Sequence, residues 1–376
     1  MIVLVVSNDY PPIRGGISAV AENCVACLKK GGNEVVAVVP RKSLETAIDA
    51  CDAAIGYWGY ERIWTRFPSV IFCLIFGLLR WRPDAVLALN VSYAGPVLAF
   101  FPKPWRPRMI LAAFGLEFLK WPHSTLFQGM VRWMYGRADA VLTVSRHMTD
   151  RLISRGIDQG KIRVLHVHVK LREVPEESDA RRLQETTCSG SPLLLTVARL
   201  VHRKGIDLVL HALPAVLKSC PGAMYWVVGE GPERSKLEKL ARDLGISERV
   251  VFMGECSSQE VAVAYEMADL FVMTPRTNEA SGDVEGLGLT YVEAALAGLP
   301  CVGSLSGGVP EAIEHGVSGW LIPEEDSNAL AEAVIEILQD PDLCSRMGQQ
   351  GKARAQRLFS SENMQNDLEF LLGKER

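Results

Sequence analysis

Apolar residues along this chain gather in short runs that alternate with stretches of helical spacing. Ile2–Val6 is a run rich in β-branched residues, positions 17–30 have helical spacing, and Gly31-Gly32 interrupts this pattern before a second run at Glu34–Val39. Short apolar runs that alternate with helices are typical of parallel sheets covered by helices on both faces. The first part of the chain therefore predicts an α/β domain that begins with a buried strand.

The same order of elements returns in the second half. Leu193–Val197 is another buried-type run, a loop follows it to Gly205, and a helical pattern begins at about Asp207. Two halves that each begin with a strand, a loop and a helix predict two doubly wound, Rossmann-like domains, whose ligands would bind at the carboxyl ends of the strands. Further strands are expected at Tyr225–Val228, Val250–Met253, Leu270–Met273 and Pro300–Gly303.

A polar segment without clear periodicity separates the two halves. Positions 173–182 are rich in charged residues, as an exposed linker is, and we place the join between Val169 and Pro192. The expected parts of the chain are residues 1–170, residues 171–359, and a capped helix at residues 360–376.

Length and composition agree with two globular domains in a reducing compartment. A chain of 376 residues is long for one core, and 48% hydrophobic and 22% charged residues are globular values. The nine cysteines lack the spacing of a disulfide framework, and Cys24 and Cys27 are interpreted as two thiols on one helix face. The apolar start, Met1 to Ser7, lacks the basic flank and cleavage site of a signal peptide, which favours a cytoplasmic protein.

The net charge of −4 hides an unequal distribution. Residues 1–170 contain 21 Lys and Arg against 12 Asp and Glu, a balance of +9, and the remainder contains 19 against 32, a balance of −13. A basic half beside an acidic half suggests that the first domain meets an anionic surface.

An unbroken apolar run at Val70–Leu79 has two possible explanations. Ten residues cannot span a bilayer, but apolar helices flanked by Trp and basic residues can lie in a membrane interface. The alternative is a buried helix with solvated ends, and the positive charge of this half favours the membrane slightly. The Trp and basic residues in question are Arg62, Trp64, Arg66, Arg80, Trp81, Arg82, Lys103, Trp105, Arg106, Arg108, Lys120, Trp121, Arg132 and Trp133.

The segment from Glu285 to Glu293 combines two carboxylates with two glycines. It predicts a loop that enters a helix, which should end at Gly298 with Pro300 just beyond. The first turn of a helix offers free N–H groups and a positive dipole end to an anion, whereas carboxylates accept hydroxyl protons. The segment therefore suits a ligand that carries both phosphate and hydroxyl groups, such as a nucleotide-sugar.

Arg199 and Lys204 lie in the loop that follows the expected strand Leu193–Val197. A loop can direct both cations at one diphosphate, with Arg as a fork and Lys as a point charge. Two solvated surface cations are the alternative. Gly15-Gly16 permits close approach of the backbone to a ligand, and Gly307-Gly308 is similar, but each is a weak signal alone.

The order of these motifs resembles that of retaining glycosyltransferases of family 4, and the resemblance covers nearly the whole chain. The stretch from Arg276 to Glu293 looks most like the phosphatidylinositol mannosyltransferase branch. The resemblance implies the GT-B architecture, in which two facing Rossmann-like domains clamp a nucleotide-sugar and the last helix packs on the first domain. The motifs are Pro-Pro-Ile-Arg-Gly-Gly at 11–16, Ala-Asp-Ala-Val-Leu-Thr-Val-Ser at 138–145, Ala-Arg-Leu-Val-His-Arg-Lys-Gly at 198–205, and Glu-x7-Glu at 285–293 followed by Gly-Leu-Pro at 298–300.

Residue functions follow from the resemblance where the motifs match. Arg199 and Lys204 would bind the donor diphosphate and stabilise its charge as it leaves, while Glu285 would hold hydroxyls of the donor sugar; these three are the expected catalytic residues. Glu293 would hold the ribose hydroxyls. The other expected donor-binding residues are Gly15 and Gly16 in the first loop, Gly254 and Cys256 at the base, and Gly286, Leu287, Gly288 and Leu289 before and at the helix start.

The activity implied is transfer of a hexose from a nucleoside diphosphate to a hydroxyl group, with retention at the anomeric carbon and without a metal or other cofactor. No residue is an obvious nucleophile, so stabilisation of the leaving diphosphate and orientation in a dry cleft would do the work. The basic, Trp-bearing first half favours a lipid-linked acceptor and a peripheral location on the inner membrane face. Nucleic acid is not an expected partner.

Two departures from the family pattern affect these expectations. Phe114 stands where many relatives carry a histidine that touches the donor sugar, so the identity of that sugar is open. His166 and His168 lie in a segment that replaces the usual Pro-Asn-Gly-Val-Asp. Two histidines without a third ligand are more often structural than metal-binding.

Two other functions fit the same architecture. A nucleotide-sugar 2-epimerase would need an acid and a base at the sugar, and the sequence offers no such pair. A nucleotide-sugar sensor would bind donor without turnover. Donor incubated alone distinguishes the first alternative, because only an isomerase produces an epimer without an acceptor.

Overall fold

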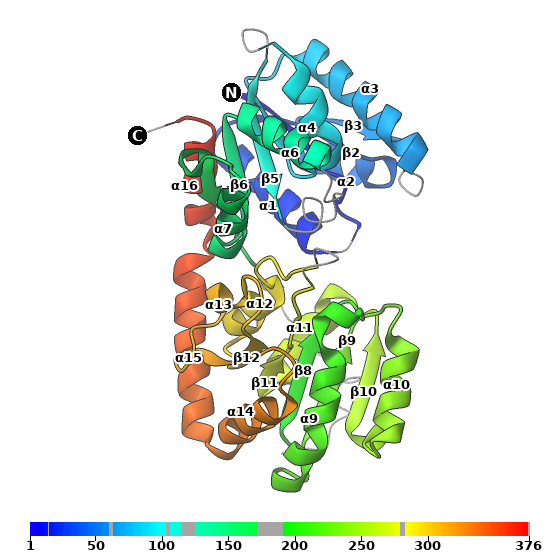
Figure 1. Ribbon diagram of the computed structural model, residues 1–376, viewed down its shortest axis with the longest axis vertical. Coiled ribbons are helices and arrows are strands. Elements are labelled where there is room, and N and C mark those ends of the chain that lie inside the picture. The colour runs from blue at the N-terminus through cyan, green and yellow to red at the C-terminus, as the bar shows by residue number, and fades with distance from the viewer. Residues whose placement is uncertain are drawn as a thin grey trace. The chain divides into compact units, whose positions relative to one another are not determined.

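The computed structural model describes residues 1–13, 15–59, 63–102, 106–114, 125–170, 191–278 and 283–374, and at positions 63–65, 91–93 and 125–127 it describes the backbone alone. The chain divides into two compact units. The first comprises Met1–His168 together with Phe359–Arg376, and the second comprises Val169–Leu358 (Figure 1).

In its described part, the first unit contains a seven-stranded parallel sheet in the order β3-β2-β1-β4-β5-β6-β7. The strand order reverses between β1 and β4, so the carboxyl ends of these two strands form the switch point at which such sheets bind ligands. The strands are β1 (Ile2–Val6), β2 (Glu34–Pro40), β3 (Ala53–Tyr57), β4 (Ala85–Ala88), β5 (Arg108–Ala113), β6 (Ala140–Thr143) and β7 (Ile162–Val164). The helices are α1 (Gly16–Lys30), α2 (Leu44–Ala50), α3 (Ile63–Trp81), α4 (Val91–Phe100), α6 (Thr125–Arg137), α7 (Arg146–Ser154) and α16 (Ser361–Leu371).

The second unit repeats this plan with a six-stranded parallel sheet among its described residues, in the order β10-β9-β8-β11-β12-β13. Its switch point lies between β8 and β11. The strands are β8 (Leu193–Val197), β9 (Met224–Val228), β10 (Val250–Gly254), β11 (Leu270–Val272), β12 (Cys301–Ser304) and β13 (Gly319–Ile322). The helices are α9 (Ile206–Ser219), α10 (Arg234–Asp243), α11 (Ser258–Met267), α12 (Leu289–Ala297), α13 (Val309–Ala312), α14 (Ser327–Gln339) and α15 (Pro341–Leu358).

The strands form where the sequence is apolar without a break. Val3–Val6 on β1 pairs with β2 on one side and with β4 on the other, and its side chains are fully buried, as central strands covered on both faces are. The prediction of two Rossmann-like parallel-sheet domains is confirmed. The predicted strands did not include β3 to β7 of the first sheet or β13 of the second.

The last helix, α16, belongs to the first unit and contacts α1 and β7. The two histidines noted above hold this C-terminal segment. The ring Nδ1 and the backbone N–H of His166 both lie 2.9 Å from Asp367 Oδ2, and His168 Nδ1 lies 3.2 Å from the carbonyl oxygen of Phe359. These bonds support the structural interpretation of both histidines.

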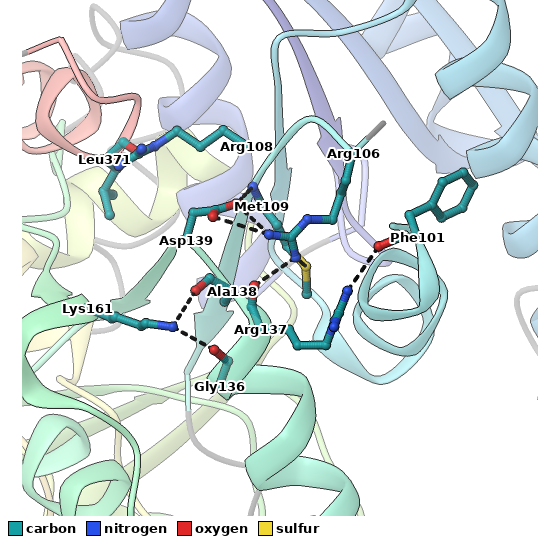
Figure 2. A network of polar contacts seen from close by, with 10 residues as sticks. All are labelled: Phe101, Arg106, Arg108, Met109, Gly136, Arg137, Ala138, Asp139, Lys161 and Leu371. Atoms are coloured by element: carbon teal, nitrogen blue, oxygen red, sulfur yellow. Dashed lines mark hydrogen bonds and ion pairs between the residues drawn. The ribbon is translucent and has the colours of Figure 1, made fainter. Parts of the chain in front are cut away.

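Arg106, one of the basic residues that the sequence assigned to a membrane surface, instead stabilises the end of α6 together with Lys161 (Figure 2). Arg106 donates from Nη1 to the carbonyl oxygen of Arg137 at 2.7 Å and from Nη2 to Asp139 at 3.0 Å, and its side chain is only 3% exposed. Lys161 donates to two further carbonyl oxygens there. The last carbonyls of a helix lack intrahelical partners and attract cations. A membrane contact for Arg106 is therefore wrong.

Arg108 is also engaged within the unit, because its Nε donates to the carbonyl oxygen of Leu371 at 2.6 Å (Figure 2). Of the same set, Arg62, Lys103, Trp105, Lys120, Trp121 and the side chain of Trp64 lie outside the described residues.

Helix α3 contains the apolar run at Val70–Leu79, and this run is buried on one face of the helix and exposed on the other. Val70 and Leu74 are buried, whereas Phe72 and Leu79 are 71% and 72% exposed. One face of α3 therefore packs on the sheet and the other carries large apolar side chains on the surface. Within the described part of the chain, no helix combines the length and the apolar character that a bilayer crossing requires.

Candidate active site

The predicted donor-binding residues of the second unit lie at the carboxyl ends of its strands, on both sides of the switch point. Residues 198–205 form the loop between β8 and α9, and its last part is a single 3-10 turn at His202–Lys204. The segment that follows β11 leads to Glu285 and then to α12. Because β8 and β11 are neighbours, these two connections meet at one edge of the sheet.

A buried ion cluster joins the two connections. Lys204 Nζ and Arg203 Nη1 each donate to Glu285 Oε2 at 2.7 Å. Lys204 is 9% exposed and Glu285 is 8% exposed. Buried charges are stable only when they are paired, and here one carboxylate oxygen serves two cations. The structure thus brings together two of the three predicted catalytic residues and adds Arg203, which sequence reasoning missed.

The pKa values in this cluster reflect competition between burial and attraction. Burial raises the pKa of the Glu285 carboxyl, but Lys204 and Arg203 lower it by more, so that it lies below its ordinary value. Burial also lowers the pKa of the Lys204 ammonium, and the neighbouring Glu285 offsets this effect only in part. Each ion therefore depends on its partner to remain charged.

The backbone on both sides of the cluster is fixed by close contacts. Gly205 has a left-handed backbone (φ 69°), and a Cβ there would collide with the carbonyl group of Thr274. The Thr274 hydroxyl donates to the Gly205 carbonyl oxygen at 2.8 Å, and the N–H of Arg276 donates to the Arg203 carbonyl oxygen at 2.9 Å. The loop that presents Arg203 and Lys204 is thereby tied to the segment that follows β11.

Glu285 is held in turn by the glycines after β12. The N–H of Gly308 donates to the Glu285 carbonyl oxygen at 2.9 Å. Gly307 has φ 54°, and a Cβ at this position would collide with the same carbonyl. The Gly307-Gly308 pair, a weak signal in the sequence, therefore supports a predicted site residue from behind.

Helix α12 begins and ends as the sequence predicts. Gly288 is its N-cap and Gly298 its C-cap, both with left-handed backbone, and Leu289 is its first residue. Glu293 is the fifth residue of this helix, so it lies just over one turn in. Its Oε2 accepts a 2.8 Å hydrogen bond from the hydroxyl of Tyr265 on α11.

Arg199 lies at the same edge of the sheet but outside the ion cluster. Its side chain is exposed and forms no ion pair or hydrogen bond with the residues that the structure describes. The loop backbone beside it is anchored, since the N–H of Leu200 donates to the Glu230 carbonyl oxygen at 2.9 Å. Arg199 is thus a cation on a fixed backbone that is available to an anionic ligand.

The remaining predicted donor contacts are distributed over both units. Gly254 ends β10 and Cys256 is buried just after it. Gly15 and Gly16 lie in the first unit, where Gly15 is the N-cap of α1. Their assigned functions, like those of Gly286, Leu287, Gly288 and Leu289, stay predictions.

The switch point of the first unit carries a polar cluster that sequence reasoning did not single out. The N–H of Asn8, after β1, donates to Asn90 Oδ1 after β4 at 2.6 Å. The buried hydroxyl of Tyr57 donates to Asn8 Oδ1 at 3.0 Å. Phe114 directly follows β5 at the same edge of this sheet and is half-buried. The signal in the sequence that could have revealed this cluster is the presence of short polar residues just after apolar runs.

Family models cover most of the chain. A model described as glycosyltransferase family 4 matches residues 14–173, and one described as glycosyl transferases group 1 matches residues 179–354.

Two similar proteins match this chain over more than nine tenths of its length. A GDP-mannose-dependent α-(1-6)-phosphatidylinositol monomannoside mannosyltransferase of Mycolicibacterium smegmatis is 31% identical over 93% of this chain and 92% of its own. A GDP-mannose-dependent monoacylated α-(1-6)-phosphatidylinositol monomannoside mannosyltransferase of Corynebacterium glutamicum is 28% identical over 99% of this chain and 98% of its own.

Solved structures share the fold at low identity. HepE of Anabaena, in complex with UDP and glucose, has a TM-score of 0.81 at 19% identity and covers 100% of both chains. Sucrose-phosphate synthase of Thermosynechococcus elongatus has a TM-score of 0.81 at 21% identity over 99% of this chain and 98% of its own.

Proposed function

The chain belongs to glycosyltransferase family 4, and from this premise we propose that it transfers a hexose from a nucleoside diphosphate to a hydroxyl group of a lipid or lipid-linked glycan. The observation that carries this proposal is the Lys204–Glu285–Arg203 cluster at the switch point of the second unit. Two cations and a carboxylate occur there side by side, in a buried setting where electrostatic interactions are strong; binding of a diphosphate and of sugar hydroxyls would require groups of these kinds.

The leaving group is the part of the reaction that these residues serve. Breaking the bond between the sugar and the diphosphate places additional negative charge on the diphosphate, and Lys204 with Arg199 would stabilise it. Glu285 would orient the hexose through its hydroxyls and Glu293 the ribose. The acceptor hydroxyl would attack the face that the diphosphate leaves, with retention at the anomeric carbon and without a metal or cofactor.

The choice of donor and acceptor rests on the relatives. Those that match over the full length are named as GDP-mannose-dependent mannosyltransferases that act on phosphatidylinositol monomannosides. GDP-mannose is therefore the first donor to test, and a phosphatidylinositol mannoside the first acceptor. UDP-glucose is the second donor, because the HepE structure of the same fold contains UDP and glucose.

A lipid acceptor requires access to a membrane, and α3 offers a surface for it. Its exposed face carries the α3 stripe, which we define as Phe72, Phe76 and Leu79, and Arg80 and Arg82 follow on the exposed side. Figure 1 shows α3 along the outside of the first unit. Apolar side chains beside basic ones suit the interface of an anionic bilayer, so we assign the α3 stripe to the inner membrane face.

The test is transfer of labelled mannose from GDP-mannose to phosphatidylinositol mannosides in anionic vesicles. We expect lipid-bound product with the wild-type chain and none with Glu293→Ala. An epimer formed from donor alone would favour a 2-epimerase, and donor binding without turnover on any acceptor would favour a sensor. Neither binding nor turnover with GDP-, UDP- or ADP-sugars would overturn the proposal.

A further inference from the structure

Arg203 is placed to act on the donor site through Glu285. It follows β8 on the same 3-10 turn as Lys204, and its carbonyl oxygen is anchored by the N–H of Arg276 at 2.9 Å. Its guanidinium reaches Glu285 Oε2 at 2.7 Å, the same atom that Lys204 contacts. Its side chain is 24% exposed, against 11% for Lys204.

Charge explains why two cations on one carboxylate matter. When a diphosphate engages Lys204, Lys204 alone would no longer fix the Glu285 carboxylate in the orientation that the donor sugar requires. A second cation on the same carboxylate oxygen keeps this buried group paired and in place. With Arg203 the cluster carries a net charge of +1, so Lys204 can direct its other N–H groups at the diphosphate while Glu285 remains paired.

We propose that Arg203 is a positioning residue that holds the Glu285 carboxylate for the donor sugar while Lys204 engages the donor diphosphate. The inference rests on the proposed function, since it assumes that the site binds a nucleoside diphosphate sugar. It adds a third cation whose effect is specific to the sugar half of the donor. Arg203 touches neither the phosphate nor the sugar in this assignment; it acts through Glu285.

Binding of GDP and of GDP-mannose separates this effect from the alternatives. In Arg203→Gln we expect GDP-mannose affinity to fall by roughly tenfold or more, because Glu285 loses its second partner, and GDP affinity to change by less than about threefold. Arg203→Lys should restore most of the GDP-mannose affinity, since it keeps the charge. Arg346→Gln, an exposed arginine on α15, is the matched control and should alter neither affinity.

A double-mutant cycle tests whether Arg203 acts through Glu285. In a Glu285→Gln background, Arg203→Gln should cause no further loss of GDP-mannose affinity, because the carboxylate that it holds is gone. Equal losses of GDP and GDP-mannose would identify Arg203 as a direct phosphate ligand and overturn the inference, as would additive losses in the cycle. A lowered thermal midpoint with both affinities intact would reduce Arg203 to a structural residue and overturn it too.

Failure of this inference differs from failure of the proposed function. If the wild-type chain binds no nucleoside diphosphate sugar, the proposed function is wrong. If wild type binds GDP-mannose and Arg203→Gln binds it equally well, only the inference is wrong. Should Arg203→Gln fold too poorly to titrate, Arg203→Met replaces it, because it keeps much of the apolar stem without the charge: a loss confined to GDP-mannose supports the inference, and unchanged affinities or equal losses of both ligands overturn it.

Discussion

The hydroxyl of Tyr265 donates a 2.8 Å hydrogen bond to Glu293 Oε2 and so fixes a carboxylate of α12 from the neighbouring helix α11. Tyr265 is buried, and burial followed by the nearby Glu293 charge raises the pKa of its phenol well above the ordinary value. The phenol therefore stays protonated and remains a donor at neutral pH. Glu293, the expected ribose ligand, is presented in one orientation before donor binds.

Tyr265→Phe should raise the KM for donor about tenfold or more and leave kcat nearly unchanged, because a hydrogen bond to a charged group contributes about 1.5 kcal/mol or more. Steady-state kinetics over a range of donor concentrations measures both constants. Tyr225→Phe is the matched control, since this buried hydroxyl pairs with Thr196 inside the core. It should lower stability without changing KM, and a similar KM for all three proteins would contradict the prediction.

The ion cluster predicts unequal costs for its members. Lys204→Ala leaves Glu285 paired with Arg203, whereas Glu285→Ala leaves two cations without their carboxylate. Loss of a partner in a buried pair costs about 3–5 kcal/mol, so Glu285→Ala should lower the free energy of unfolding far more than Lys204→Ala. Urea titrations measure both.

Lys204→Ala should also reduce kcat/KM by about a hundredfold or more, as loss of a group that stabilises developing charge does. Glu293→Ala should abolish transfer with the fold intact. Near wild-type turnover in both variants would remove these residues from the active site.

Gly307→Ala tests the support behind Glu285. A left-handed backbone costs an L-residue about 1–2 kcal/mol, and here the new Cβ would also collide with the Glu285 carbonyl. Gly245→Ala is a matched control, because Gly245 has φ 70° with open space around its Cβ position. Gly307→Ala should therefore be the less stable variant in thermal unfolding and the only one with reduced transfer activity. Equal stability of the two would show that the collision is relieved without cost.

Acid should weaken the cluster in a defined range of pH. The pKa of Glu285 lies below its ordinary value of 4.5 in the folded chain, so the unfolded chain binds this proton more readily. The stability that Glu285 contributes is complete above about pH 4.5 and is lost as the pH falls through the lowered folded pKa. The difference in unfolding free energy between wild type and Glu285→Gln should be flat above this pH and shrink below it. A constant difference down to pH 3 would contradict this.

The sequence predicted the fold because the sheets are built from local signals. Ile2–Val6 and Leu193–Val197 are apolar without a break, and each lies at the centre of a parallel sheet, where both faces are buried. Strand β13 escaped prediction because its four residues, Gly319–Ile322, lie at a sheet edge and begin with a glycine. A strand that short has no period to detect.

The sequence predicted the motifs of the candidate site but not which of its residues form ion pairs with one another. Glu285 and Lys204 were expected near one ligand. The ion pairs of Glu285 with Lys204 and with Arg203, however, join residues that are 81 and 82 positions apart in the sequence, and only the fold brings them together. Arg106 was misjudged for the same reason: its partners, at Arg137 and Asp139, lie at the end of a helix that the sequence does not place beside it.

The α3 stripe gives the last prediction, on binding to membranes. Phe72, Phe76 and Leu79 are exposed, so Phe72→Ser and Phe76→Ser should leave the fold unchanged. A fully buried apolar side chain contributes about 1.5–3 kcal/mol, and the double variant should therefore bind anionic vesicles at least about tenfold more weakly in flotation assays. Ile48 is an exposed apolar residue on α2, so Ile48→Ser is the control and should bind like wild type.

Binding of the wild-type chain to anionic vesicles should also weaken as the salt concentration rises, because Arg80 and Arg82 flank the stripe. Equal flotation of wild type and the double variant would place the membrane contact elsewhere, and no flotation of wild type at low salt would favour a soluble acceptor.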